Sequence, residues 1–344
     1  MLKTDGSVWA SGLNLYGQLG DGSRRTDSKN FERVFASGAT AVAAGGGHSL
    51  VLKEDDSVWA AGRNKFGQLG DGSNIDRYAF VLVVDSGTQA VAVGARHSLL
   101  LKRDGSVWAT GSNLYGQLGL HMGSNELIAG KRTFAKVDCC EATAVAAGTA
   151  HSMMLKKDGS VWVTGWNQDG QLGDGSTKIR RTFAQIVPRG AQAIAAGGYH
   201  SMVLMQDGNV WTVGDNTFGQ LGDGTQVLTQ KQLKMVTGEV VAAVAISAGM
   251  SHSLLLGEDG SVWVAGRNNC GQLGDGTTTS KREFEQIITR GAEVVAAGAW
   301  HTMVMGGQHS VWATGLNEYG QLGTGSAELF ETGFVKVWPG SDGV

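Results

Sequence analysis

The chain has 344 residues, of which 42% are hydrophobic and only 17% are charged, so it is not an intrinsically disordered protein. Its formal net charge of −3 argues against bulk nucleic-acid binding, and no apolar run approaches the ~18 residues of a membrane-spanning helix. Glycine accounts for 54 residues, about twice the usual share, which predicts many turns and close backbone approaches.

The first residues, MLKTDGSVWA, lack the apolar core of a secretory signal peptide. The three cysteines, Cys139, Cys140 and Cys270, do not suggest a disulfide framework, because adjacent cysteines are poor partners for each other. Both features favour a reducing compartment, so we expect an intracellular protein of the cytoplasm or the nucleus.

One tryptophan marks each of seven repeated units, at intervals of 49 to 54 residues. The seven units nearly exhaust the chain, so residues 1–344 are expected to form a single repeat domain without a linker. Repeats of this length are typical of solenoids and propellers. The marker residues are Trp9, Trp59, Trp108, Trp162, Trp211, Trp263 and Trp312.

Residues 41–83 illustrate the order of elements within one unit. A small apolar segment comes first, two segments with period-two alternation follow, and the turn-rich phrase NKFGQLGDGS leads to a last apolar segment. An Asp-Gly pair joins the second and third segments in most units, and it suits a tight hairpin. We therefore predict an all-β fold, a seven-bladed β-propeller of four-stranded antiparallel blades. The strands predicted in this unit are 41–45, 48–53, 57–62 and 79–83.

The first unit lacks one part of this pattern. The chain has seven tryptophan units and seven GQLG phrases but only six GxxH segments. The missing segment corresponds to residues 194–202, so one blade is expected to lack its inner strand and to keep three strands. Two explanations stay open: the sequence is a truncated reading of a longer gene, or a partner strand fills the gap, since open sheet edges are usually covered.

The repeated unit VAAGxxHSxxLKxDGSVWxxGxNxxGQLGDG resembles the repeat of the regulator of chromosome condensation family over essentially the whole chain. The resemblance implies the same seven-bladed propeller. One departure is that the proline usual in the family's last strand is mostly absent. The residues in that region are Phe31, Phe80, Phe134, Phe183, Leu233, Phe284 and Phe334.

The repeated GQLGDG phrase is interpreted as architecture. Its glycines permit tight turns, Leu19 can fill a core, and Asn14 and Gln18 can satisfy turn amides. A phosphate-binding loop would need a Gly-Lys-Ser/Thr ending, and a calcium loop would need the EF-hand ligand spacing; the phrase has neither. No cofactor is therefore expected.

The sequence shows no constellation of catalytic or metal-binding residues, so we do not expect an enzyme. One histidine per unit would be spread around a propeller, and the Ser or Thr after it suits a local hydrogen-bonded tie. Cys270 stands where most units have an aromatic residue; it is either a reactive thiol or a packed side chain. The histidines are His48, His97, His151, His200, His252 and His301.

Variable residues of the repeats indicate a binding face. In a four-stranded meander, the loop between strands one and two and the loop between strands three and four lie on the same face. Several residues there are larger than the fold requires, and Arg, Tyr and Trp are enriched at interaction hot spots. The candidates are Arg96, Tyr199, Met250 and Trp300 in the first loop, and Arg63, Trp166, Asp215 and Arg267 after the third strand.

A series of basic residues precedes the fourth strand of most units. On the same face, they would favour an acidic partner surface; the alternative is that they are ordinary solvated loop residues. The long segment 120–134 is a further candidate contact. The series contains Arg24, Arg25, Lys131, Arg132, Arg180, Arg181, Lys281 and Arg282, together with Lys29, Arg77, Lys178 and Lys231.

These features predict a non-enzymatic scaffold that binds a protein partner through the loop face. The resemblance implies an alternative, guanine-nucleotide exchange on a small Ran-like GTPase, which is the activity of the founding family member. Two other activities of the fold find less support in the residues. The Gly-Trp-Arg-His-Thr motif of the plant ultraviolet-B photoreceptor is only approached at 298–302, and no signal peptide supports a secreted β-lactamase inhibitor.

Overall fold

The computed structural model describes residues 1–121, 130–138, 141–236 and 242–338. Its contacts divide the chain into two compact units. Unit 1 comprises Met1–Trp166 and Lys178–Arg189, and unit 2 comprises Asn167–Thr177 and Gly190–Val344. The organisation of 1–344 as a single domain stays a prediction.

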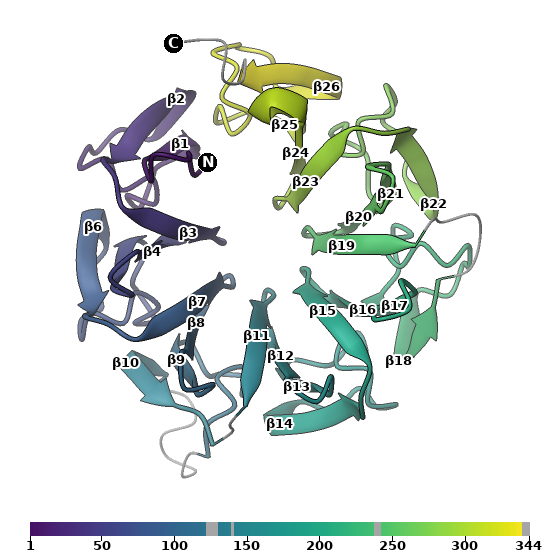
Figure 1. The fold of residues 1–344 in the computed structure, drawn as a ribbon, viewed down its shortest axis with the longest axis horizontal. Helices are drawn as coiled ribbons and strands as arrows, with labels where there is room; N and C mark the ends of the chain where they lie inside the picture. The colour runs from purple at the N-terminus through teal and green to yellow at the C-terminus, as the bar shows by residue number, and fades with distance from the viewer. Residues whose placement is uncertain (122–129, 139–140, 237–241, 339–344) are drawn as a thin grey trace. The chain divides into compact units, whose positions relative to one another are not determined.

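Unit 1 contains a two-stranded sheet and three four-stranded antiparallel sheets (Figure 1). In each four-stranded sheet the strands pair in chain order, and the first strands of successive sheets, β3, β7 and β11, lie side by side. These are the predicted propeller blades. The strands are β1 (Val8–Leu13), β2 (Asp27–Phe35), β3 (Ala39–Ala44), β4 (His48–Lys53), β5 (Val58–Gly62), β6 (Arg77–Val84), β7 (Thr88–Val93), β8 (His97–Lys102), β9 (Val107–Gly111), β10 (Lys131–Lys136), β11 (Ala142–Ala147), β12 (His151–Lys156), β13 (Val161–Gly165) and β14 (Arg180–Val187).

Unit 2 contains three further four-stranded blades of the same kind, so the all-β propeller prediction is confirmed. One 3₁₀ turn, η1 (Gly307–His309), interrupts the strands. The strands are β15 (Ala191–Ala196), β16 (His200–Met205), β17 (Val210–Asp215), β18 (Thr229–Met235), β19 (Ala243–Ala248), β20 (His252–Gly257), β21 (Val262–Gly266), β22 (Lys281–Ile288), β23 (Ala292–Ala297), β24 (His301–Gly306), β25 (Ser310–Leu316) and β26 (Phe330–Trp338).

The sheet of β1 and β2 is the incomplete blade. The two strands pair antiparallel, and an isolated bridge joins Leu2 to Val8. No strand precedes this bridge in the described residues, so the predicted lack of an inner strand is confirmed. The second of the three strands expected in this blade is reduced to the bridge.

The Asp-Gly hairpins between second and third strands have a clear physical basis. Asp104 Oδ1 accepts hydrogen bonds from the backbone N–H of Ser106 at 2.9 Å and from its hydroxyl at 2.6 Å, and Gly105 has a φ of 76°. Trp108 Nε1 then donates to Ser106 Oγ at 3.0 Å. The repeated DGSVW sequence therefore closes the hairpin and orients the tryptophan that marks each unit.

The hydrophobic cores lie between successive blades. In unit 1, Leu99 and Val107 belong to one cluster with Met154 of the next blade. In unit 2, Leu204 belongs to one cluster with Leu255 of the following blade. Each blade thus buries its alternating apolar residues against a neighbour, as expected of a repeat protein.

The repeated GQLGDG phrase forms a connection with internal hydrogen bonds. Asn64 Oδ1 accepts the backbone N–H of Leu69 at 3.0 Å, and Asn64 Nδ2 donates to Asp71 at 2.8 Å. Gln68 Oε1 accepts the backbone N–H of Phe66 at 2.9 Å. The architectural interpretation of Asn and Gln in this phrase is confirmed.

The same phrase also docks onto the next blade. Gly70 has a φ of 78°, and a Cβ atom added there would lie 2.5 Å from the Phe134 ring, which belongs to the fourth strand of the following blade. Only glycine satisfies both conditions. Phe134, one of the residues in the region where the family usually has proline, is therefore packed against the phrase of the preceding repeat.

Candidate functional site

The loops that were predicted to share a face meet at the blade junctions. In unit 1, the guanidinium carbon of Arg96, in the loop after β7, lies 5.0 Å from the centre of the Phe66 ring, in the connection after β5. Arg63, directly after β5, lies 4.7 Å from the centre of the Tyr16 ring of the preceding blade. The loop between strands one and two of a blade and the connection between strands three and four therefore lie close together within unit 1.

Each junction brings two chain positions to one place. The residue that follows the glycine near the end of each third strand donates its backbone N–H to the carbonyl of the residue that precedes the repeat histidine of the same blade. Arg63 donates to Gly47 in this way at 2.8 Å, and Arg267 donates to Ser251 at 2.8 Å. Side chains at the two positions therefore compete for the same space. This space lies beside the connection of the preceding blade, and we call it the junction seat.

In each seat one position carries Arg, Trp or Tyr and the other carries a smaller side chain. In three seats the large residue follows the third strand and the other is small: Arg63 with Gly47, Trp166 with Ala150, and Arg267 with Ser251. In the other three seats the large residue precedes the histidine: Arg96 with Ser112, Tyr199 with Asp215, and Trp300 with Leu316. Both positions of the repeat can be found in the sequence, but only the hydrogen bond shows that they are partners. The large seat residues are Arg63, Arg96, Trp166, Tyr199, Arg267 and Trp300.

One seat contains an edge-to-face pair of aromatic rings, and another contains a cation between two rings. In unit 1, Trp166 lies 4.4 Å from Tyr115, ring centre to ring centre, at an interplanar angle of 68°. In unit 2, the guanidinium carbon of Arg267 lies 4.6 Å from the Phe218 ring and 4.2 Å from the Trp300 ring. Such contacts hold long side chains in one orientation at the surface.

The remaining two candidates of this face are engaged within the fold. Asp215 accepts hydrogen bonds from the backbone and hydroxyl of Thr217 and from Gln220 Nε2, the last at 2.6 Å. The Met250 sulfur lies where a Cβ on Gly198 would come within 2.7 Å. Both residues lie at the junctions, but these contacts give each of them a structural task.

The basic series differs from its prediction in position. Nine of its members were expected in loops, and the structure places them in fourth strands, because these strands begin earlier than the apolar pattern indicates. They are Lys29 in β2, Arg77 in β6, Lys131 and Arg132 in β10, Arg180 and Arg181 in β14, Lys231 in β18, and Lys281 and Arg282 in β22.

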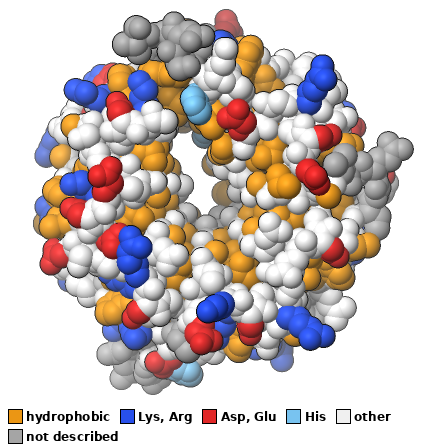
Figure 2. Space-filling view, in the orientation of Figure 1, with side chains coloured by type: hydrophobic (Ala, Val, Ile, Leu, Met, Phe, Trp, Pro, Cys, Tyr) orange, Lys and Arg blue, Asp and Glu red, His pale blue; other side chains and the backbone are white. Residues whose placement is uncertain are grey.

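Part of this basic charge is compensated within the same repeat. The Asp of the GDG phrase pairs with a base that follows it: Asp21 with Arg25 at 2.8 Å, Asp71 with Arg77 at 2.7 Å, and Asp275 with Lys281 at 3.4 Å. Burial raises the pKa of Asp71, but hydrogen bonds from Ser73 and Arg77 lower it, and the net direction is down. In Figure 2, Lys and Arg side chains stand in separate groups with Asp and Glu side chains near them.

Other members of the series are bound by backbone or rings. The guanidinium carbon of Arg24 lies 4.9 Å from the Tyr78 ring, and Arg282 donates to the carbonyl of Thr225 at 3.3 Å. Arg181 donates to the carbonyl of Leu114 at 3.5 Å. Of the segment 120–134, residues 122–129 lie outside the described residues, so that candidate contact stays a prediction.

Exposed aliphatic side chains accompany the seats. They occupy the third-to-fourth-strand connections, where Ile75 is 64% exposed and Leu228 is 57% exposed. Apolar side chains on a loop face beside aromatic and arginine residues are typical of protein-binding surfaces. Further examples are Leu15, Leu114 and Ile179 in unit 1, and Val227 and Leu329 in unit 2.

The repeat histidines tie neighbouring blades together. His48 Nε2 lies 2.7 Å from Ser98 Oγ, and Ser98 Oγ donates its single proton to the carbonyl of Gln68 at 2.7 Å. His48 Nε2 therefore carries a proton and donates it. The expected tie thus exists, but it joins successive blades instead of adjacent residues. Burial lowers the pKa of His48 to about 3, so the ring is neutral.

Neither metal nor thiol chemistry finds a site in the described part of the chain. No three His, Cys, Asp or Glu side chains there are grouped so as to hold a metal ion. Cys270 is half-buried, and burial raises the pKa of its thiol, which favours the packed over the reactive interpretation. Cys139 and Cys140 lie outside the described residues.

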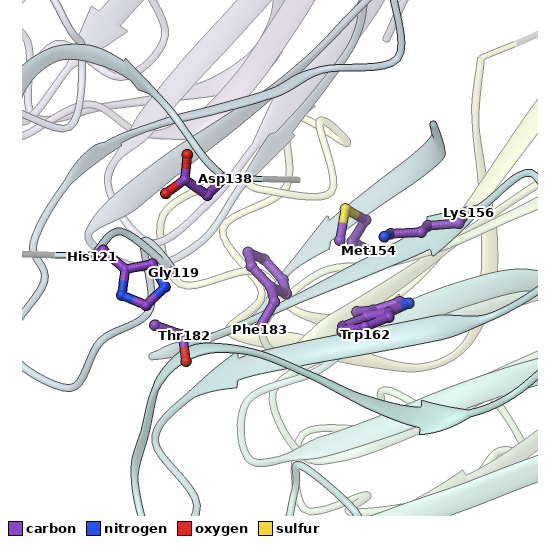
Figure 3. A pocket seen from close by; sticks show the side chains of 8 residues that line it. All are labelled: Gly119, His121, Asp138, Met154, Lys156, Trp162, Thr182 and Phe183. Carbon is purple, nitrogen blue, oxygen red and sulfur yellow. The ribbon is translucent and has the colours of Figure 1, made fainter. Parts of the chain in front are cut away.

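A cavity of about 210 Å³ lies in unit 1, away from the seats (Figure 3). Trp162 and Lys156 form one end, where Lys156 Nζ lies 4.4 Å from the indole ring, and His121 and Asp138 form the other. Its volume is below the roughly 300–1,000 Å³ of ordinary ligand pockets. Of the sequence-predicted candidate contacts, only the segment 120–134 contributes to the lining, through His121.

The repeat sequence matches known family models over most of the chain. Two models, each described as a regulator of chromosome condensation (RCC1) repeat, match it. One covers residues 39–68, 89–117, 142–171, 191–220 and 243–272, and the other covers 5–52, 158–204, 207–256 and 259–305. A search of curated proteins found no match. Among the described residues, no helix has the length and apolar character needed to cross a membrane.

Solved structures share the fold at low sequence identity. Human WBSCR16 is 23% identical with a TM-score of 0.86, over 96% of this chain and 93% of that chain. Prp20p from Saccharomyces cerevisiae is 21% identical with a TM-score of 0.84, over 98% and 87%. Yeast RCC1 (Prp20) bound to Kap60 is 21% identical with a TM-score of 0.81, over 96% and 84%.

Proposed function

Because the chain belongs to the regulator of chromosome condensation (RCC1) repeat family, we propose that it is a non-enzymatic scaffold that binds a protein partner through its junction seats. The proposal places it inside the cell, in the cytoplasm or the nucleus. The observation that carries it is the content of the seats: each holds one large residue, and all six are Arg, Trp or Tyr. These three types dominate interaction hot spots.

Stability alone does not account for this choice of residues. A seat at the surface could hold any side chain that fits beside its small partner. Arg, Trp and Tyr offer a large contact area, and ring or cation contacts hold several of them in place, as at Arg267 between Phe218 and Trp300. Side chains ordered in advance lose less entropy when a partner binds.

The fold neighbours support a protein as the class of partner. The structures of yeast Prp20p are described by its binding to Gsp1p and histones and by its complex with Kap60. Those partners belong to that protein. We carry over to this chain only the class of partner, which is a protein.

A pull-down with chemical crosslinking and mass spectrometry tests the proposal. The native chain is compared with a variant carrying Arg96→Ala, Tyr199→Ala and Trp300→Ala, which empties three seats. The matched control carries Lys157→Ala, Gln206→Ala and Glu258→Ala, three exposed residues in hairpins between second and third strands. We expect a partner that the control retains and the seat variant loses. A partner retained equally by all three chains would contradict the proposal.

Guanine-nucleotide exchange is the second candidate, and the likeness of fold to Prp20p supports testing it. The assay is release of labelled GDP from a purified Ran-like GTPase with catalytic amounts of the chain. The scaffold proposal expects no acceleration over the spontaneous rate. Acceleration that the seat variant abolishes would assign exchange to the same face.

A further inference from the structure

We propose that Arg63 and Arg96 of unit 1 form a clamp across Phe66 that binds the carboxylates of an acidic peptide segment. This inference rests on the proposed function, because it names the chemistry of the partner at two of the seats. It does not follow from the basic series of the fourth strands, part of which is compensated within the fold.

The geometry places two guanidinium groups around one ring. The guanidinium carbon of Arg63 lies 6.0 Å from the centre of the Phe66 ring, and that of Arg96 lies 5.0 Å from it. The two carbons are therefore no farther apart than the sum of these two distances. Alternate residues of an extended peptide are about 7 Å apart and point to the same side, so two of their carboxylates can reach both arginines.

Neither arginine has an acidic partner of its own. No Asp or Glu of the described chain forms an ion pair with Arg63 or Arg96, whereas Arg25, Arg77 and Arg103 all have one. Asp76, in the same connection as Phe66, accepts the backbone N–H of Asn64 at 2.7 Å and pairs with neither arginine. Two neighbouring uncompensated cations repel each other, and an anion between them relieves that repulsion.

Aromatic rings, Tyr16 and Phe66, position the two cations without using up their hydrogen-bond donors. A guanidinium over an aromatic face keeps its N–H groups free at the edge, where they match the two oxygens of a carboxylate. Arg96 is exposed and Arg63 is half-buried, so solvent and ligands reach the pair. The corresponding seat of unit 2 differs, because Trp300 stands there in place of a second arginine and the Nε of Arg267 donates to Asn269.

An acidic peptide fits this site better than a nucleic acid does. Nucleic-acid binding rests on neutralising several phosphates along a basic track. The formal net charge here is −3, and the basic residues around the clamp include members such as Arg25 and Arg77 that already have acidic partners. Two free arginines match a pair of carboxylates.

Fluorescence anisotropy with a labelled peptide tests the clamp. The probe is Glu-Ala-Glu-Ala-Glu-Ala-Glu, and the reference peptide has Gln in place of each Glu. We expect the full chain to bind the probe and not the reference, and Arg63→Gln or Arg96→Gln to weaken binding at least tenfold. Arg25→Gln, which removes an already paired arginine, should leave binding unchanged. Arg96→Lys should recover only part of it, because an ammonium lacks the planar fork.

Three results would overturn the inference: no binding of the probe, equal binding of the Gln peptide, or tighter binding of an eight-nucleotide oligothymidylate that the same two variants abolish. Thermal melting of each variant verifies its fold. The two experiments distinguish failure of the clamp from failure of the scaffold proposal. If the crosslinked partner depends on the seats while the peptide ignores Arg63 and Arg96, only the clamp is wrong; if the clamp binds the peptide and no partner depends on the seats, the scaffold proposal is wrong.

Discussion

The backbone N–H of Arg63 donates to the carbonyl of Gly47 at 2.8 Å, and this hydrogen bond makes their side chains alternatives for one seat. A Cβ added to Gly47 would lie 3.5 Å from the Cβ of Arg63 and 3.7 Å from the Tyr16 ring. A larger side chain at Gly47 would therefore have to displace Arg63 from Tyr16. The alternation of large and small residues follows from this shared space.

Gly47→Arg should destabilise the protein by about 1 kcal/mol, because two long side chains would crowd one seat. Gly47 has no left-handed φ, so the substitution tests space and not backbone strain. Adding Arg63→Ser should recover most of the loss, since the pair then reproduces the Arg96 and Ser112 seat. A double-mutant cycle in urea measures the coupling. Additive effects of the two changes would show that the positions do not share a seat.

Gly70→Ala should destabilise the protein by roughly 2–4 kcal/mol, because it adds a clash with Phe134 to the cost of a left-handed φ. Gly72→Ala is the matched control in the same connection. Its φ is 83°, but a Cβ there meets only Thr133, at 3.9 Å. The control should therefore lose only about 1–2 kcal/mol. Equal losses in urea denaturation would mean that the ring does not pack against Gly70.

Stability should fall as the pH drops below neutrality, because His48, His97 and His252 are buried and neutral. Burial lowers each pKa from 6.5 to about 3. Between these values the unfolded chain binds protons that the folded chain does not bind, so acid favours unfolding in the window from pH 6.5 to about 3. His151 and His301 behave in the same way, since burial lowers the pKa of each to about 4. At pH 5.5 each histidine should cost about 1.4 kcal/mol, and the five together about 7 kcal/mol.

Urea denaturation at pH 7.5 and pH 5.5 measures this difference. His48→Gln is the control, because its amide can still donate to Ser98 but does not titrate, and it should reduce the difference by about 1.4 kcal/mol. A free energy of unfolding that is the same at both pH values would contradict the neutral, buried assignment.

The fold could be read from the sequence because its signals are local and occur seven times. Alternation, the Asp-Gly hairpin and the marker tryptophan each act within a few residues, and the hydrogen bonds of Asp104, Ser106 and Trp108 show why they occur together. The incomplete first blade was predictable for the same reason, since one repeat segment is absent from the count.

Contacts between successive repeats could not be predicted from the sequence in the same way. A periodic sequence shows which residues recur but not which neighbour each one meets, so the partner of His48 was expected at the next residue and lies at Ser98. The seat partners are separated by 16 residues in the case of Gly47 and Arg63. Only the hydrogen bond between them shows that these two positions of the repeat belong to one seat.

The most direct test of the binding face is site-specific photo-crosslinking. A benzoylphenylalanine residue replaces Arg96 in one chain and Lys157, in the hairpin after β12, in another. We predict that the first chain crosslinks to a partner protein and the second does not. Crosslinks to that partner from Lys157 and none from Arg96 would place binding on the hairpin side and contradict the role assigned to the seats.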